Sequence, residues 1–106
     1  MARGDVYSLS PPRGQRGHEQ GGRRYAVVLQ NDAVSALSTV VIAPTSARAP
    51  RYAFRPQAEV AGKPTRILVE QLAAVDPSRL GRRVGRLAWD EMAAVEDALK
   101  IVLGLV

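Results

Sequence analysis

The chain has 106 residues, 46% of them hydrophobic and 24% charged, which predicts one globular domain over residues 1–106 with one hydrophobic core. Its net charge is +5 and it has no cysteine, so disulfide frameworks, thiol catalysis and cysteine-ligated zinc are excluded. His18 is the only histidine and no carboxylate cluster accompanies it, so we expect no metal and no cofactor. Since no stretch reaches the roughly eighteen apolar residues of a membrane span, and no apolar signal core is present, we expect a cytoplasmic protein without membrane contact.

The positive charge is concentrated in the first two-thirds of the chain. Residues 1–66 carry ten basic and four acidic side chains, whereas residues 67–106 carry five basic and six acidic ones. A positive field attracts nucleic acid, anionic lipid or an acidic protein partner, but it decides neither fold nor catalysis.

The first predicted element is a half-buried strand over residues 5–10, where side chains alternate between the two faces. Residues 10–22 then contain two prolines and four glycines, a composition typical of a loop. Loops of about a dozen residues are uncommon in compact domains and are often functional.

This loop leads through two glycines and two arginines into an almost continuously apolar segment, residues 25–30, which predicts a central strand covered on both faces. Glycine lets the backbone approach a ligand closely, and the arginine fork matches phosphate or carboxylate. The junction therefore predicts a phosphate-binding mouth, although an ordinary loop with two solvated arginines fits the same residues.

A third strand is predicted over residues 39–43, which Pro44 either ends or places at a sheet edge. Thr45 and Ser46 then lie at a strand end, where hydroxyls either donate to an anion or cap the next turn. Residues 47–65 predict short edge strands and turns, with weak alternation at residues 52–54 and 58–60.

The last part of the chain predicts a buried strand, a helical turn, a short strand and a helix. Their ranges are residues 66–72, 76–81, 82–87 and 90–103. The helix has one apolar face, acids in its first turn and Gly104 as its stop. The order of elements predicts a mainly β fold, a five- or six-stranded antiparallel barrel with one C-terminal α-helix.

Several segments also match a known pattern in their order along the chain. They include RGDVY at residues 3–7, EQGGRR at 19–24, VLQND at 28–32, VIAPTS at 41–46, VEQL at 69–72 and the helix with its LGL ending. This ordered set resembles the MazF/PemK endoribonuclease toxins of type II toxin–antitoxin modules, over nearly the whole chain except about residues 48–63. The resemblance implies an SH3-like barrel, shared with CcdB, that forms a homodimer. It also implies metal-independent cleavage of single-stranded RNA at short sequences, neutralised by a MazE-like antitoxin.

The resemblance also implies functional residues. Arg24 corresponds to the catalytic arginine and Thr45 to the catalytic hydroxyl. The positions implied to line the RNA groove are Glu19, Gly21, Gly22, Arg23, Ser46 and Gln71. Tyr25 stands where the family commonly has proline after the catalytic arginine, so the choice between Arg23 and Arg24 stays open.

Other functions remain as alternatives. A non-catalytic binder on the same fold, such as a CcdB-like gyrase poison or an RNA-binding barrel, fits the same pattern of elements. The gyrase poison ends in a tryptophan-containing tripeptide, whereas this chain ends Gly104-Leu105-Val106. His18 as a general base has no counterpart in the family, and a membrane-surface role rests on charge alone. Ala88 stands where a capping side chain usually begins the last helix.

Overall fold

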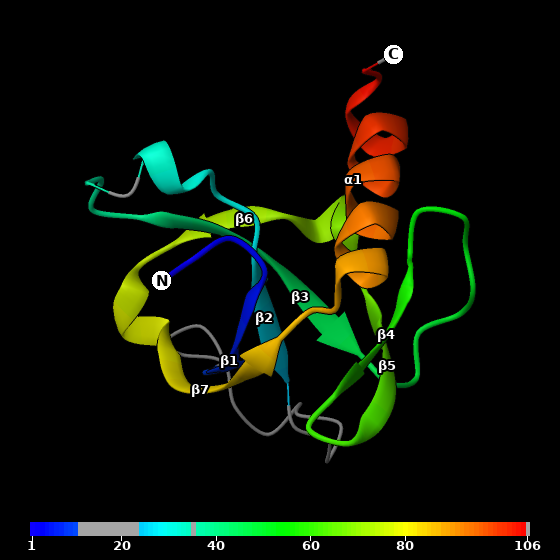
Figure 1. Ribbon diagram of the computed structural model, residues 1–106, viewed down its shortest axis with the longest axis horizontal. Helices are drawn as coiled ribbons and strands as arrows, with labels where there is room; N and C mark the ends of the chain where they lie inside the picture. The colour runs from blue at the N-terminus through cyan, green and yellow to red at the C-terminus, as the bar shows by residue number, and fades with distance from the viewer. Residues whose placement is uncertain (11–23, 35, 106) are drawn as a thin grey trace.

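The computed structural model describes residues 1–10, 24–34 and 36–105, which contain seven strands, three short 3-10 turns and one α-helix (Figure 1). In chain order these are β1 (Asp5–Leu9), β2 (Tyr25–Val28), η1 (Asp32–Val34), β3 (Val40–Ser46), β4 (Gln57–Val60), β5 (Lys63–Ile67), η2 (Val69–Gln71), β6 (Ala73–Val75), η3 (Pro77–Arg79), β7 (Leu80–Arg86) and α1 (Trp89–Leu103). The predicted fold class, mainly β with one C-terminal helix, is confirmed. The strand count exceeds the predicted five or six.

The strands form one antiparallel sheet in the order β4-β5-β3-β2-β1-β7. β3 is its long central strand, because its first half pairs with β6 and its last two residues pair with β5. On its other side β3 pairs with β2, with Ala26 opposite Pro44. The sheet curls into an SH3-like half-barrel, and α1 stands against one side of it (Figure 1).

Pro44 lies in the middle of β3, so the prediction that it ends the strand or marks an edge is wrong. It falls between the residues that pair with β6 and those that pair with β5. Its carbonyl accepts a hydrogen bond from the Leu68 N–H (2.8 Å). Because β3 changes partner at this point, the missing N–H of proline costs no ladder bond.

The predicted strand over residues 66–72 is wrong in its second half. β5 ends at Ile67, and η2 follows, with the Gln71 N–H donating to the Leu68 carbonyl (2.9 Å). Ile67, Leu68 and Val69 are all buried, so this apolar run continues from a strand into a turn that packs toward α1. Residues 52–54, where an edge strand was also expected, lie between strands.

The core consists of two clusters on the two faces of the central strands. One lies toward α1 and includes Val27, Ala43, Ile67, Val69 and Val95. The other includes Ala26, Val28, Val40, Ile42 and Val75. Successive residues of β2 therefore enter different clusters, which confirms a central strand covered on both faces.

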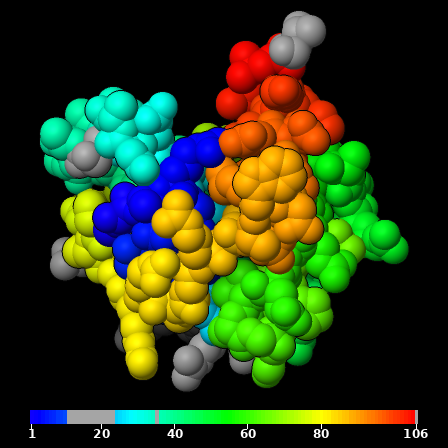
Figure 2. Space-filling model, in the orientation of Figure 1, coloured from blue at the N-terminus to red at the C-terminus, as the bar shows by residue number. Residues whose placement is uncertain are grey.

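Helix α1 begins at Trp89, and its capping comes from inside the helix. Ala88 contributes no side-chain bond, but the Glu91 carboxylate accepts from the Ala88 N–H (2.7 Å) and from the Glu59 N–H of β4 (2.9 Å). Gly104 ends the helix with a φ of +70°. The last turns of α1 project beyond the sheet (Figure 1), and they form the red protrusion of the surface in Figure 2. Among the described residues, no helix has both the length and the apolar character that a membrane crossing requires.

Candidate functional site

The candidate site lies where the end of β3 meets the start of β2. Thr45 is the next-to-last residue of β3 and is 1% exposed. Its Oγ1 accepts a hydrogen bond from the backbone N–H of Tyr25 (3.2 Å). A hydroxyl that accepts one hydrogen bond still has its own proton to donate. Thr45 is therefore oriented by β2, and among the described residues its own proton has no acceptor.

Arg24 is the exposed residue directly before β2, and the structure brings it to Thr45. Its Nε donates to the Thr45 carbonyl (3.0 Å), and its own carbonyl accepts from the Leu9 N–H of β1 (3.1 Å). Both the backbone and the root of the guanidinium are thus held in place. Within the described part of the chain, the two Nη groups have no partner. The Nε bond holds the guanidinium in place, while the two Nη groups remain as donors. A guanidinium held in this way is suited to bind a phosphate group.

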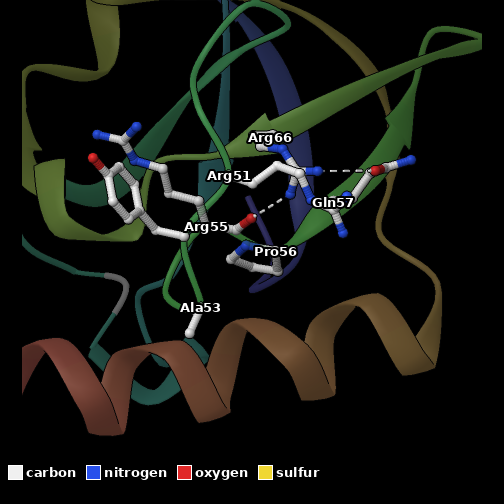
Figure 3. Close-up of a pocket in the computed structure, with 7 residues that line it drawn as sticks. Arg51, Ala53, Arg55, Pro56, Gln57 and Arg66 are labelled. Atoms are coloured by element: carbon white, nitrogen blue, oxygen red, sulfur yellow. Dashed lines mark hydrogen bonds between the residues drawn. The ribbon is translucent and has the colours of Figure 1, made fainter.

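A row of polar residues crosses the sheet from this point. Ser46, half-buried, lies opposite Arg66 of β5, and Arg66 lies opposite Gln57 of β4. Arg24 reaches the same end of β3 through the bond from its Nε to the carbonyl of Thr45, the residue before Ser46. Since antiparallel partners share a face, Ser46, Arg66 and Gln57 form one row, and the Arg24 side chain reaches β3 next to it. Arg66 donates from Nη2 to the Gln57 side chain (3.3 Å), in agreement with this placement (Figure 3).

The structure does not bring all of the remaining predicted site residues to the junction of β2 and β3. Gln71 is exposed at the end of η2, and among the described contacts none joins it to Arg24, Thr45 or Ser46. The other predicted positions, Glu19, Gly21, Gly22 and Arg23, lie outside the described residues, as does His18.

Sequence reasoning missed the ion pair between Arg55 and Glu70. Arg55, from the segment between β3 and β4, donates from Nε (2.9 Å) and Nη2 to one carboxylate oxygen of Glu70 in η2. The hydrogen bond from Arg55 is the main cause that lowers the pKa of Glu70, and it outweighs burial, which raises it. The other oxygen, Oε1, is buried without a partner among the described residues. No local signal joins positions fifteen residues apart, so only the fold reveals this pair.

Comparison with known proteins places the chain in a family. The family model for the PemK-like, MazF-like toxin of the type II toxin–antitoxin system matches residues 2–103. Rv3098A of Mycobacterium tuberculosis, itself named as a candidate toxin, is 43% identical over 106 residues, 99% of each chain.

Two solved structures have closely similar folds. An endoribonuclease from a mycobacterial species, solved in complex with its cognate antitoxin, has a TM-score of 0.81 at 17% identity, with 100% of this chain and 97% of that chain covered. MazF from Deinococcus radiodurans has a TM-score of 0.78 at 29% identity, with 98% and 96% covered. Because the family model spans nearly the whole chain, the protein belongs to the PemK-like, MazF-like toxin family of type II toxin–antitoxin systems.

Proposed function

We propose that this protein is the endoribonuclease toxin of a type II toxin–antitoxin module, which cleaves single-stranded RNA at short sequences in the cytoplasm without a metal ion. Family membership supports the toxin role, and the fold shared with a mycobacterial endoribonuclease supports the activity. The single observation in the site that carries the proposal is the guanidinium of Arg24, which its Nε anchors to the backbone carbonyl of Thr45.

In the proposed reaction, the 2′-hydroxyl of a ribose attacks the adjacent phosphorus and the bond to the 5′-oxygen of the next nucleotide breaks. The products are a cyclic phosphate and a 5′-hydroxyl. Negative charge gathers on the phosphoryl oxygens in the transition state, where the Nη groups of Arg24 bind them. A guanidinium keeps its charge in proteins, so we assign Arg24 to electrostatic stabilisation and not to proton abstraction.

Thr45 is the proposed second donor to the same phosphate. Its hydroxyl oxygen accepts from the Tyr25 N–H, so the hydroxyl proton is the donor that we propose for the phosphate. Because Thr45 is 1% exposed, its hydrogen bond would form in a site of low dielectric, where such a bond is stronger than in water. Ser46 and Gln71, with Glu19, Gly21, Gly22 and Arg23, are the proposed contacts to the remainder of the RNA.

Two protein partners belong to the proposal. A MazE-like antitoxin with an acidic tail would neutralise the basic face, as the complex of the mycobacterial neighbour with its antitoxin supports. A second copy of the chain would form a homodimer. Large apolar side chains exposed at the projecting end of α1 support a protein contact there: Ile101, Leu103 and Leu105.

Incubation of the purified protein with a long single-stranded RNA in EDTA tests the proposal directly. We expect discrete cuts with 5′-hydroxyl ends, and a loss of about a hundred- to a thousandfold in rate for Arg24→Ala and for Thr45→Ala. Arg24→Lys should lose activity similarly, because one ammonium cannot replace the anchored two-donor edge of the guanidinium. Arg82→Ala is the matched control, since it removes an exposed arginine on β7 and should leave the rate unchanged.

Melting temperatures of the variants separate chemistry from folding. Arg24 is exposed, so Arg24→Ala should unfold within a few degrees of the wild type. Parallel loss of activity and melting temperature would argue against the catalytic role. If the folded wild type cuts none of several RNAs, the proposal fails in favour of the non-catalytic binder, and a pull-down for gyrase or an antitoxin becomes decisive.

A further inference from the structure

The segment between β3 and β4 forms a pocket beside the candidate site. Its volume is about 470 Å³, within the range of small-molecule sites, and its lining includes Arg51, Tyr52, Arg55, Gln57 and Arg66. Arg51 and Arg55 belong to this segment, whereas Gln57 begins β4 and Arg66 lies in β5, and the Arg66 guanidinium donates to the Arg55 carbonyl (3.0 Å) (Figure 3). The segment falls within residues 48–63, which carry no part of the resemblance drawn from the sequence.

One face of the Tyr52 ring is open in this pocket. Phe54 stacks on Tyr52 with ring centres 5.2 Å apart and planes within 3°. The Arg55 guanidinium lies 4.8 Å from the Tyr52 centre and 6.0 Å from the Phe54 centre. These separations put Phe54 and Arg55 on the same face of Tyr52, because a cation over the opposite face would lie farther from Phe54. Tyr52 is 53% exposed, so its second face is available to a ligand.

The charges around this face favour an anion. The ion pair between Glu70 and Arg55 holds the segment in place. Because Glu70 balances the charge of Arg55, Arg51 and Arg66 are the remaining positively charged side chains that line the pocket. Arg51 has no hydrogen bond or ion pair among the described residues. A flat aromatic face beside arginines is the combination that binds single-stranded nucleic acid, in which bases stack and phosphates pair. An acidic peptide would satisfy the arginines but would leave the aromatic face without a planar partner.

The pocket and the candidate site lie on the same row of residues. Arg66 belongs to both, since it lines the pocket and lies opposite Ser46. Neighbouring strands are about 4.8 Å apart, so β2, which Arg24 precedes, and β5, which contains Arg66, run about 10 Å from each other across β3. That distance suits neighbouring positions along one RNA strand.

We propose that this pocket is a nucleotide subsite, in which a base flanking the cut stacks on Tyr52 and its phosphate lies between Arg51 and Arg66. The inference rests on the proposed function, because it names how the same RNA strand is held beyond the reacting phosphate. Tyr52 contributes a sequence-tolerant contact, since every base has a stacking face.

Binding of a labelled single-stranded RNA tests the subsite. The RNA spans a mapped cut and carries a 2′-deoxy substitution there, which removes the attacking hydroxyl and blocks cleavage. Tyr52→Ala should weaken binding by about 5- to 150-fold, and Tyr52→Phe by less than about twofold. Arg51→Ala should reduce the slope of log affinity against log salt by about 0.7, whereas Arg82→Ala should not. Tyr52→Leu keeps apolar packing on Phe54 but lacks a stacking face, so it should bind as weakly as Tyr52→Ala.

A scan with single abasic nucleotides locates the base. One abasic position next to the cut should weaken binding to the wild type and should have no further effect in Tyr52→Ala, because the same contact is already lost. Additive losses at every position would overturn the subsite.

The outcomes separate this inference from the proposed function. If the wild type cuts RNA and the Tyr52 variants bind it equally well, the subsite is wrong and the ribonuclease stands. If the Tyr52 and Arg51 variants lose affinity only for an acidic antitoxin-tail peptide, the pocket is a protein contact and the inference falls. If the wild type neither cuts nor binds RNA, the proposed function itself fails.

Discussion

Ala61 has a backbone φ of +52°. Residues other than glycine and asparagine adopt this left-handed backbone conformation only at a cost in conformational energy. With Gly62, at φ +80°, it forms the two-residue turn between β4 and β5, where Val60 pairs with Lys63. Such turns favour Asn-Gly, because both central residues need positive φ. The turn therefore holds local strain, which the pairing of β4 with β5 maintains.

Relief of this strain gives a prediction at the residue scale. Ala61→Asn should raise the free energy of unfolding by about 0.5–1 kcal/mol, a few degrees in melting temperature, because Ala61 is exposed and no packing is lost. The matched control is Ala61→Val, whose β-branched side chain should lower the melting temperature at the same exposed position. Equal melting temperatures for the wild type and both variants would show that the turn is not strained.

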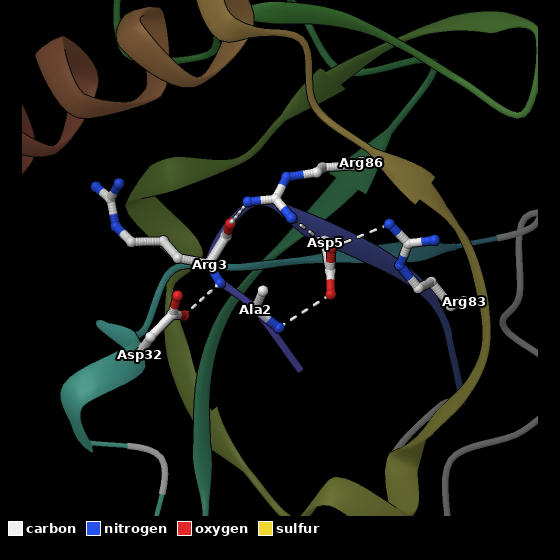
Figure 4. A network of polar contacts seen from close by, with 6 residues as sticks. All are labelled: Ala2, Arg3, Asp5, Asp32, Arg83 and Arg86. Atoms are coloured by element: carbon white, nitrogen blue, oxygen red, sulfur yellow. Dashed lines mark hydrogen bonds and ion pairs between the residues drawn. The ribbon is translucent and has the colours of Figure 1, made fainter.

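At the scale of elements, Asp5 joins β1 to β7 and to the start of the chain. The buried carboxylate accepts from the Ala2 N–H (2.9 Å) and from Arg83 (3.3 Å), and Arg86 lies 3.7 Å away (Figure 4). Burial raises the pKa of Asp5, but these hydrogen bonds and charges together lower it below its ordinary value. The register between β1 and β7 shifts on both sides of Tyr7, and the ion pairs of Asp5 tie the start of β1 to this edge strand.

The pKa shift predicts how stability depends on pH. A carboxyl group whose pKa is lowered by folding stabilises the native state above its unfolded pKa, about 3.9, and that stabilisation is lost as pH falls through the folded pKa. Asp5→Asn should therefore cost about 1–2 kcal/mol at pH 7, measured by urea unfolding. The difference between wild type and variant should shrink below about pH 4. A constant difference from pH 7 to strongly acidic buffer would show that the charge of Asp5 is not the cause.

At the scale of the whole molecule, charge is distributed unevenly over the fold. The net charge is +5, and three arginines lie on or beside the row that crosses the sheet: Arg24, Arg51 and Arg66. An RNA strand along this row would neutralise about one phosphate per arginine. Affinity should then fall with salt, because the bound counterions are released when phosphates pair with arginine.

The release of counterions predicts a measurable slope of log affinity against log salt concentration. For the 2′-deoxy RNA, log affinity should fall against log salt with a slope of about −2 or steeper, since each phosphate adds about −0.7 for single strands. Fluorescence titration from about 50 to 200 mM salt measures it. Affinity that is independent of salt would contradict a phosphate-based mode of binding.

Much of the fold was predictable because its signals are local. Helix α1 follows from apolar side chains at three- and four-residue intervals and begins and ends within one residue of the predicted range. The turn η3 follows from Asp76 and Pro77, and the Asp76 carboxylate does accept from the Ser78 N–H (2.8 Å). The boundary between β5 and η2 failed because a buried turn and a buried strand have the same apolar composition.

By itself the sequence determined the elements with strong local signals, the basic first part of the chain and the ordered motifs of the family. The resemblance carried by these motifs pointed to Arg24, with Arg23 left as the alternative, and to Thr45 as candidate catalytic residues, and the fold joins the Arg24 Nε to the Thr45 backbone carbonyl. Only the tertiary structure decided that Pro44 lies within a central strand, that Arg55 pairs with Glu70 and that Arg66 lies opposite Ser46. The reason is that strand pairing joins residues far apart in the chain, and their register depends on the packing of the whole sheet.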